Sequence, residues 1–423
     1  MKRVVPLAAG VAIAAVLLGY GVIRASSNHG RVATASPTAS AGVTATATPS
    51  AASLLSAVDF VTPEIGWAVS GSTADPGGAR TIYKTIDSGR HWTAQNSWYG
   101  TYWMGRNYLL GIQLIFVDDR RGFVLDPGQS PPALYRTSDG GSSWEKLDLT
   151  TQLAPGWPLT FVDPDNGFLL ADVGAAMGQS SASVYRTSDG GRHWTRVAHV
   201  NYNAQSQGLS SAGDKDGLIF RTNSAGWMTA WSTAGPPMIW STFDGGLSWT
   251  EQNVPIPQGL YFSGNGAPDR PRFFTSQQGA FPIVVTLVPA PNGQPMSVPA
   301  EGYPSALYVY PTSDGGRHWL APRRLPPLGS QNAPLYWEFL DANHWWVGTG
   351  DHLWISRDAG QTWKELRLAL PTGYTVMNLN FLTADVGYAL AISARPGYLA
   401  NGSLLLKTAD AGVLWTVVPV PGQ

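Results

Sequence analysis

Seven short segments of the chain share an aspartate, a glycine and a tryptophan at fixed spacing, a constellation that could in principle bind a metal or perform catalysis. The pattern is [Ser/Thr]-x-Asp-x-Gly-x-x-Trp, and it recurs about every 54 residues. A calcium loop needs several acidic oxygens around one ion, whereas each copy offers one carboxylate, so we expect no metal. A catalyst has no reason to be repeated around a fold. The seven aspartates are Asp87, Asp139, Asp189, Asp244, Asp314, Asp358 and Asp410.

Turn formation explains all four shared positions. The aspartate can accept hydrogen bonds from the backbone N–H groups that follow it, and glycine tolerates a left-handed backbone that a Cβ would disfavour. The Ser or Thr hydroxyl can bond locally, and the tryptophan can return into the sheet and pack between sheets. We therefore predict that these residues build the fold and do not contact a substrate.

A second repeated element precedes most copies. It consists of an aromatic residue, about five turn-forming residues, a glycine and another aromatic, as in DFVTPEIGWAV from residue 59. The fifth copy shifts its second aromatic by one position, and the sixth has Trp345 in place of the glycine. The flanking residues alternate in polarity or run apolar, which indicates four strands in each unit.

Seven units of four strands predict an all-β, seven-bladed β-propeller over residues 54–423, because one blade alone cannot bury both faces of its sheet. We expect the ring to close by packing of the first blade on the last. A strand exchanged from residues 53–58 is the alternative.

Composition fits a turn-rich β protein and excludes several kinds of site. The 423 residues include 48 Gly, 32 Pro and 18 Trp, and 13 % are charged. The chain has no cysteine, which excludes disulfides and thiolate metal sites, and we expect no cofactor. The net charge of −1 and the lack of a basic stripe argue against nucleic acid as a partner.

Residues 1–24 predict a signal anchor, that is, a transmembrane helix. Lys2 and Arg3 precede an apolar, uncharged stretch from Val4 to Ile23 that is long enough to span a bilayer as a helix. The positive-inside rule then places the rest of the chain outside the cytoplasm. Residues 23–26 form a poor cleavage site, so we favour a single-pass membrane protein over a secreted one. Residues 25–53, rich in Ser, Thr, Ala and Pro, predict a flexible linker.

With these motifs, roughly residues 55–420 resemble the Asp-box, or BNR, repeat propellers, a sialidase-like superfamily. In blade style, lack of cysteine and number of repeats, the chain is most similar to the photosystem II assembly and stability factors and their bacterial relatives. The resemblance implies that the Asp boxes join the third and fourth strands, on the face opposite the ligand site. It also implies a non-catalytic binding or scaffold protein or, alternatively, a sialidase-like or other glycoside hydrolase.

The long loops of the opposite face supply the candidate binding residues. Aromatic side chains with adaptable polar neighbours and a few arginines form recognition surfaces for a protein or a glycan. For each residue, the alternative is that it packs its loop onto the blades. We expect the protein to act as a monomer. The candidates are Trp98, Tyr99, Tyr102, Trp103, Arg106, Arg270, Arg272, Tyr303, Tyr336 and Trp337.

The hydrolase alternative lacks its sequence markers, and we predict no catalytic residue. A sialidase-like site needs three arginines, a Tyr nucleophile with a Glu partner, an Asp acid and an F-R-I-P type segment near its start. The first strand of the first unit has no arginine, and Glu301 with Tyr303 is the only Glu-x-Tyr pair. Two carboxylates within about 10 Å, beside three convergent arginines, would revive this alternative.

Overall fold

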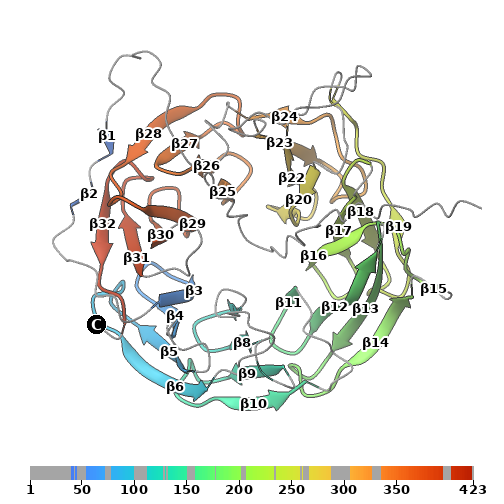
Figure 1. Cartoon of the computed structure of the whole chain (residues 1–423), viewed down its shortest axis with the longest axis horizontal. Coiled ribbons are helices and arrows are strands. Elements are labelled where there is room, and N and C mark those ends of the chain that lie inside the picture. The colour runs from blue at the N-terminus through green and yellow to red at the C-terminus, as the bar shows by residue number, and fades with distance from the viewer. Residues whose placement is uncertain are drawn as a thin grey trace, which may run out of the picture.

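The computed structural model describes residues 40–41, 43–44, 54–71, 78–99, 112–126, 129, 132–149, 158–176, 178–201, 206–232, 235–257, 260, 266–286, 305–325, 335–393 and 402–421. Seven sheets, antiparallel except for one short parallel strand at the outer edge of two of them, stand around a common centre, which confirms the predicted seven-bladed all-β propeller (Figure 1). The predicted anchor, residues 1–24, lies outside the described residues. Within them, no helix is long and apolar enough to cross a membrane.

Each blade is a meander whose first strand lies nearest to the centre (Figure 1). Blade 1 contains β3 (Leu54–Phe60), β4 (Gly66–Gly71), β5 (Ala79–Thr85) and β6 (Thr93–Tyr99). Blade 2 contains β7 (Gln113–Phe116), β8 (Gly122–Asp126), β9 (Ala133–Thr137) and β10 (Glu145–Asp148). Blade 3 contains β11 (Leu159–Phe161), β12 (Gly167–Ala176), β13 (Gln179–Thr187), β14 (Thr195–Val200) and a short fifth strand, β15 (Ser206–Gln207). Blade 4 contains β16 (Asp214–Phe220), β17 (Gly226–Trp231), β18 (Met238–Thr242) and β19 (Thr250–Glu251).

The last three blades follow the same plan. In blade 5 the first strand is divided into β20 (Gly266–Pro268) and β21 (Arg272–Phe273), and both parts pair with β22 (Gly279–Thr286). Blade 5 is completed by β23 (Ser305–Thr312) and β24 (Arg323–Arg324). Blade 6 contains β25 (Leu335–Phe339), β26 (Trp345–Thr349), β27 (His352–Ser356) and β28 (Lys364–Leu368). Blade 7 contains β29 (Tyr374–Phe381), β30 (Gly387–Ser393), β31 (Ser403–Thr408) and β32 (Trp415–Val418).

Each Asp box forms the turn between the third and fourth strands of its blade, as predicted. In blade 2 the Thr137 hydroxyl donates to Oδ1 of Asp139 at 2.8 Å, and its oxygen accepts from the N–H of Gly141 at 2.9 Å. The Ser143 N–H donates to the same Oδ1 at 2.9 Å, and the Ser143 hydroxyl donates to Oδ2 at 2.6 Å. The hydrogen bonds from Ser143 lower the pKa of Asp139 to about 2. The carboxylate is therefore occupied by its own turn.

The residue before the box glycine also has a left-handed backbone. The sequence pattern allows any residue at this position and did not predict this conformation. The φ angle is +68° at Ser88, +60° at Ala359 and +64° at Ala411, and glycine holds this position in the other boxes. A Cβ disfavours this conformation. These three turns are therefore more strained than the four with two glycines.

An aromatic residue at the end of the first strand joins neighbouring blades. Phe116 of blade 2 stacks on Trp67 of blade 1, with ring centroids 3.5 Å apart. A Cβ on Gly122 would lie 2.4 Å from Phe116, so the glycine of the second element makes room for this ring. The equivalent pairs are Phe161 with Phe123, Phe220 with Phe168, Phe273 with Trp227, and Phe381 with Trp346.

The box tryptophan packs at the boundary between blades, as predicted. Trp144 stands edge-on to Phe116 of its own blade, with centroids 6.0 Å apart, and both belong to the cluster that contains Trp67 of blade 1. Its indole N–H donates to the carbonyl of Gly141 at 3.1 Å. The tryptophan therefore also supports the ring that stacks on the preceding blade.

The boundary between blades 5 and 6 departs from this pattern through two complementary changes. Ala280 stands where the other blades have the second aromatic, and Trp345 stands where they have glycine. Trp345 is 3 % exposed, lies 4.8 Å from Phe339 between ring centroids and shares a buried cluster with Ala280. The bulk missing from blade 5 is thus supplied by blade 6.

The ring closes by packing of blade 1 on blade 7, as expected. The four antiparallel strands of each of these blades are continuous in sequence, and residues Val43–Thr44 only add a fifth strand at the outer edge of blade 7. The Leu55 N–H donates to the Ser403 hydroxyl oxygen at 2.9 Å, and the Trp92 indole N–H donates to the carbonyl of Pro419 at 2.9 Å.

Two pieces of the predicted linker pair with the outer edge of the ring. β1 (Ser40–Ala41) runs parallel to β28, and β2 (Val43–Thr44) runs parallel to β32. The linker, predicted as flexible over residues 25–53, is therefore held against blades 6 and 7 at these residues.

Candidate binding site between blades 4 and 5

The predicted binding residues that the structure describes do not form one surface. Trp98 is 8 % exposed and donates its indole N–H to the Asp126 carboxylate at 2.7 Å. Tyr336 is 3 % exposed, and its hydroxyl donates to the carbonyl of His352 at 2.8 Å. Both side chains pack the blades, so we correct their assignment from binding residues to structural ones. Trp337 is half-buried in the cluster between blades 5 and 6.

Three other candidates are accessible to different degrees. Tyr99, the last residue of β6, is 76 % exposed at the outer edge of blade 1. Arg270 and Arg272 are half-buried in the divided first strand of blade 5. Tyr99 therefore lies at the edge of the ring, and the two arginines lie near its centre. The remaining four candidates, Tyr102, Trp103, Arg106 and Tyr303, lie outside the described residues.

A buried ion pair next to Trp98 was missed by the sequence reasoning. Arg80 of β5 and Asp126 of β8 form it, with side chains 3 % and 0 % exposed. The Gln129 side chain also donates to the Asp126 carboxylate at 3.4 Å. A buried pair with its hydrogen bonds supplied by the protein is a structural contact, and this one joins blades 1 and 2.

Two backbone irregularities lie on adjacent first strands, in blades 4 and 5. The register of β16 against β17 shifts between Lys215 and Gly217, so Asp216 bulges out of the ladder. The first strand of blade 5 is interrupted between β20 and β21, at Asp269 to Pro271. Proline lacks the N–H that a ladder needs, which accounts for the interruption. Bulges commonly redirect side chains near functional sites.

Blades 4 and 5 come into close contact between these irregularities, at a glycine. A Cβ on Gly217 would lie 2.0 Å from Oγ1 of Thr229 and 3.2 Å from Cγ of Arg270, so the missing side chain lets blade 5 approach blade 4. Nε of Arg270 lies 3.8 Å from Oδ1 of Asp269. Thr229 is fully buried, and neither its hydroxyl nor Oδ1 of Asp216 has a hydrogen-bond partner of normal geometry among the described residues. The Thr229 hydroxyl is nevertheless near enough to Asp216 to lower its pKa slightly.

Burial raises the pKa of two carboxyl groups in this region. Burial raises the pKa of Asp216 well above its usual range, and the carboxylates of Asp269 and Asp214 raise it further. In the next blade, burial raises the pKa of Glu338 to about 7, with Arg272 opposing the rise and Asp269 adding to it. Like charges that repel one another favour protonation or the arrival of a cation.

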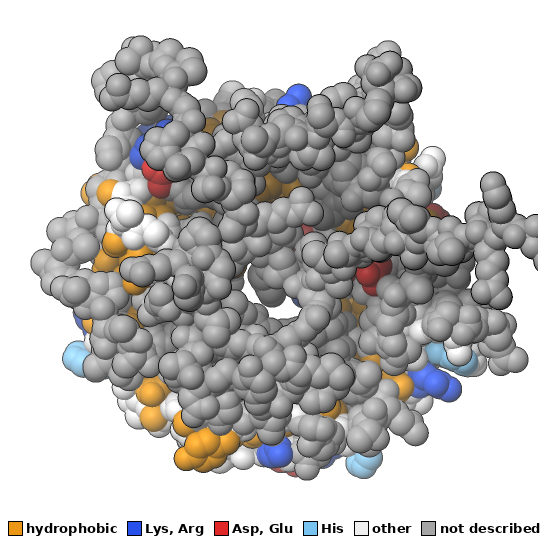
Figure 2. Space-filling view, viewed as in Figure 1, with side chains coloured by type: hydrophobic (Ala, Val, Ile, Leu, Met, Phe, Trp, Pro, Cys, Tyr) orange, Lys and Arg blue, Asp and Glu red, His pale blue; other side chains and the backbone are white. Residues whose placement is uncertain are grey.

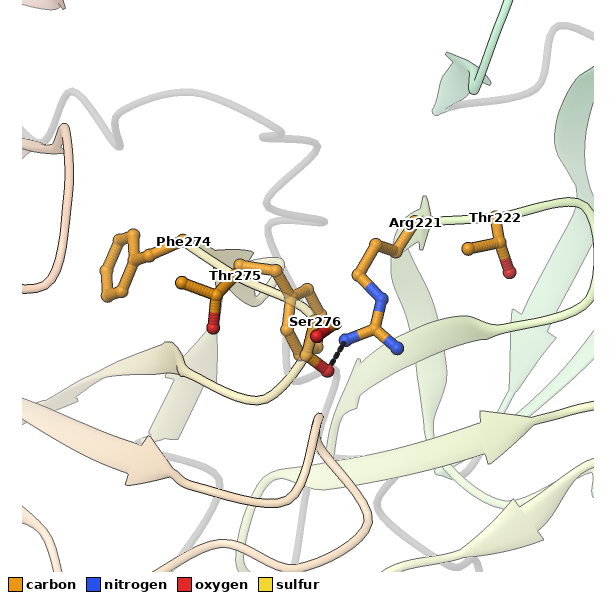
Figure 3. A pocket seen from close by; sticks show the side chains of 6 residues that line it. Arg221, Thr222, Phe274, Thr275 and Ser276 are labelled. Atoms are coloured by element: carbon orange, nitrogen blue, oxygen red, sulfur yellow. Dashed lines mark hydrogen bonds between the residues drawn. The ribbon is translucent and has the colours of Figure 1, made fainter.

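A separate hollow lies on the Asp-box face of the same two blades (Figure 3). Its volume is about 320 Å³, and Arg221 and Ser276 are among its lining residues. Arg221 donates to the carbonyl of Ser276 at 2.6 Å, and its guanidinium lies 5.0 Å from the centroid of the Phe273 ring. Lys84 makes a similar contact between blades 1 and 2, donating to the carbonyl of Gly140 at 2.9 Å. These cations hold neighbouring turns together, so the hollow belongs to the scaffold.

The Lys, Arg and His side chains described on the face shown in Figure 2 lie around the rim and do not gather in one patch. A nucleic-acid footprint needs a basic patch or stripe. The described side chains of this face do not provide one.

Residues 43–217, from β2 to the middle of β16, match the family model described as photosynthesis system II assembly factor YCF48. The chain is a seven-bladed β-propeller with Asp-box turns, and its first half is similar to that family. Among solved structures, this propeller is similar to "YCF48 bound to D1 peptide", with a TM-score of 0.52 and 17 % identity, covering 89 % of this chain and 100 % of that chain.

Enzymes share the same architecture. A family PL25 ulvan lyase matches with a TM-score of 0.51 and 12 % identity over 84 % of this propeller and 91 % of the lyase. A puromycin-hydrolysing peptidase of Mycobacterium tuberculosis matches with a TM-score of 0.51 and 12 % identity over 91 % of this propeller and 57 % of the peptidase. At these identities the similarity shows the fold alone. No curated protein matches the sequence.

Proposed function

We propose that this Asp-box propeller is a non-catalytic binding or scaffold protein that recognises a polypeptide segment, similar in type to the photosystem II assembly factors. The match of residues 43–217 to that family and the likeness to YCF48 with its bound peptide support this proposal. The observation that carries it is the boundary between blades 4 and 5, where two buried oxygens, Oδ1 of Asp216 and Oγ1 of Thr229, lack a hydrogen-bond partner among the described residues. A glycan is the second ligand class that the candidate residues fit.

The location of the ring is part of the same proposal. The apolar segment from Val4 to Ile23 supports a single-pass anchor with the ring outside the cytoplasm. The linker would then start at the membrane and reach the outer edge of blades 6 and 7, where β1 and β2 pair. We propose that the anchored protein acts as a monomer.

A display experiment tests polypeptide recognition. A random dodecapeptide library is panned on the immobilised full chain, and the same chain unfolded in urea serves as the control surface. We expect enrichment of related peptides on the folded chain alone, and competition between them for one site. If the same peptides are recovered equally from the folded and the unfolded chain, the proposed function is wrong.

A glycoside hydrolase is the second candidate, and Glu338 is the observation that favours it. A carboxyl group with a pKa of about 7 suits general acid or base catalysis near neutral pH. Arg272 is the arginine among the described residues that acts on its pKa, whereas a sialidase-like site needs three arginines. We expect no turnover of sialoside or glucan substrates by the wild-type protein. Turnover that Glu338→Gln abolishes would establish the hydrolase.

A further inference from the structure

The outer edges of three blades accept an additional strand. β15 pairs with β14 in blade 3, and β1 and β2 pair with β28 and β32 in blades 6 and 7. The additional strand runs antiparallel to its neighbour in blade 3 and parallel to it in blades 6 and 7. The last strand of a sheet presents N–H and C=O groups that lack ladder partners, and an added strand satisfies them. The outer edge of this ring therefore takes extended segments in either direction.

Blade 1 has the longest outer edge of the four blades whose outer strand has no such neighbour within the described residues (Figure 1). β6 has seven residues, TAQNSWY, without a charged residue or a proline. The other three outer strands are shorter and all contain charged residues; they are Glu145–Asp148, Thr250–Glu251 and Arg323–Arg324. Short length, charge and proline commonly protect an edge strand from pairing with another chain. β6 has none of these protections.

The backbone of β6 matches that of the strand in blade 3 that accepts β15. Ser97 of β6 and His199 of β14 are equivalent, because each lies opposite the residue four positions before the threonine of its Asp box. His199 pairs with Gln207 of β15. Both ladders shift register at the equivalent place, after Ile82 and after Val184, and this bulge does not prevent β15 from pairing. The geometry of β6 is therefore compatible with a fifth strand.

We propose that β6 is a docking site for an extended, uncharged segment of a partner protein, which adds to blade 1 as its fifth strand. The strands on the other outer edges indicate the chemistry of this segment. β1 is Ser-Ala, β2 is Val-Thr and β15 is Ser-Gln, so all three are uncharged. Valine and threonine are also favoured in strands. The site goes beyond the proposed function, which concerns the boundary between blades 4 and 5.

Two exposed side chains of β6 would meet the side chains of the added strand. Ser97 and Tyr99 are exposed, and Tyr99 reaches 76 %. Trp98 between them is buried and donates to the Asp126 carboxylate of blade 2 at 2.7 Å. Ser97 and Tyr99 therefore lie on the face of blade 1 opposite to Trp98, because successive side chains of a strand point to opposite faces. In strand addition the main chain supplies affinity, and such side chains supply specificity.

Disulfide trapping tests the proposal, because the full chain has no cysteine of its own. Ser97→Cys is equilibrated in a glutathione redox buffer with nonapeptides of the sequence TASAGVTAT, which is that of residues 38–46, each with one position replaced by cysteine. Mass spectrometry measures the yield of each mixed disulfide. We expect the yield to alternate along the peptide, with favoured positions at least about fivefold above their neighbours. Only every second side chain of an added strand lies on the face of the thiol, within the short Cα–Cα distance that a disulfide needs.

A second variant and a second peptide set are the controls. Asp385→Cys places the thiol in a turn of blade 7, at a side chain 65 % exposed, and should show no alternation. The second peptide set has proline at the positions of Ala41 and Thr44. One of these two positions faces β6 in either register, so the loss of its N–H should abolish the alternation. The thermal unfolding midpoint checks that Ser97→Cys remains folded.

Each outcome supports or overturns the docking site. Equal yields at neighbouring positions, the same alternation with Asp385→Cys, or alternation that survives the two prolines would overturn it. If the thiol of Ser97→Cys does not react with a small aromatic disulfide in the folded protein, the chain itself covers β6 and the proposal is wrong. If the variant forms a disulfide-linked dimer in preference to the peptide adducts, the occupant is a second copy and not a partner protein. The random library decides the proposed function separately, and specific peptides recovered without any alternation would leave that function standing.

Discussion

Phe60 of the first blade stacks on Tyr388 of the last, with ring centroids 3.6 Å apart and planes 5° from parallel. The same geometry joins Phe116 to Trp67 between blades 1 and 2. The ring is therefore closed by the contact that joins its internal blades, with no exchanged strand. Tyr388 adds a hydrogen bond from its hydroxyl to the carbonyl of Pro63 at 2.7 Å.

Removal of the Tyr388 ring should destabilise the closure. Tyr388 is 1 % exposed, and truncation of a buried aromatic to alanine costs about 3–5 kcal/mol. Tyr388→Phe keeps the stack and loses the hydrogen bond to Pro63, so it should cost about 1 kcal/mol. Urea denaturation of the two variants and the wild type measures both losses. If Tyr388→Ala lowers the free energy of unfolding no more than Tyr388→Phe does, closure of the ring by stacking is contradicted.

The two exceptions at the boundary between blades 5 and 6 should be energetically coupled. Trp345→Gly leaves a cavity and should cost about 3–5 kcal/mol, and Ala280→Phe adds bulk to a filled space and should cost about 1–3 kcal/mol. The double variant restores the pattern of the other blades. Its loss of stability should therefore be smaller than the sum of the two single losses by about 1 kcal/mol or more. A double-mutant cycle in urea gives the coupling, and strict additivity would show that the two positions do not compensate.

The fold could be predicted because its signals are local and repeated. Each box needs an oxygen acceptor, a left-handed residue and a tryptophan within eight positions, and seven copies make the pattern unmistakable. The sequence also marks Trp345 as an exception. Its compensation by Ala280 could not be predicted, because it depends on a contact between two blades.

The candidate site was less accessible to sequence reasoning. Aromatic residues beside loops look the same whether they face a partner or the core, so Trp98 and Tyr336 were assigned to the wrong class. Arg270 and Arg272 were named as candidates because charged residues are conspicuous in the longest repeat, and their role in binding stays a prediction. Asp216 was missed, although it precedes Gly217 in the stretch DKDG, because a β-bulge breaks the two-residue alternation on which strand reasoning relies.

Ala359→Gly should stabilise the protein, since Ala359 holds a left-handed backbone at φ +60°. Relief of a conformation that costs about 1–2 kcal/mol, offset by the greater freedom of glycine in the unfolded chain, leaves a gain of about 0.5–1 kcal/mol. Gly140→Ala is the matched reverse change in the blade 2 box and should destabilise, because its Cβ would lie 2.9 Å from the carbonyl of Asp119. Thermal and urea unfolding should give opposite signs for the two variants.

Asp139→Ala should lower stability without affecting recognition of peptides. The substitution leaves the Ser143 N–H and the Thr137 hydroxyl without their acceptor, at a cost of about 1–3 kcal/mol. Asp385→Ala, at an exposed side chain, should change stability by less than about 0.5 kcal/mol. Peptide affinity is then measured at a temperature where both variants are folded. A weakened affinity in Asp139→Ala would place function on the Asp-box face, against our assignment.

Glu338 should make stability depend on pH around neutrality. Its pKa in the folded protein, about 7, lies above the usual value of 4.5, so folding favours the protonated form. The resulting stabilisation is fully present below about pH 4.5 and is lost as pH rises through 7. Glu338→Gln mimics the protonated group and removes this loss. The free energy of unfolding of the variant should match that of the wild type at pH 4.5 and exceed it by about 1–2 kcal/mol at pH 8.5, allowing for the partial exposure of the side chain.

Urea denaturation at both pH values measures the difference, and the substitution Glu251→Gln, at an exposed side chain, is the control. A difference between Glu338→Gln and the wild type that stays constant from pH 4.5 to 8.5 would show that this carboxyl group does not titrate near neutrality.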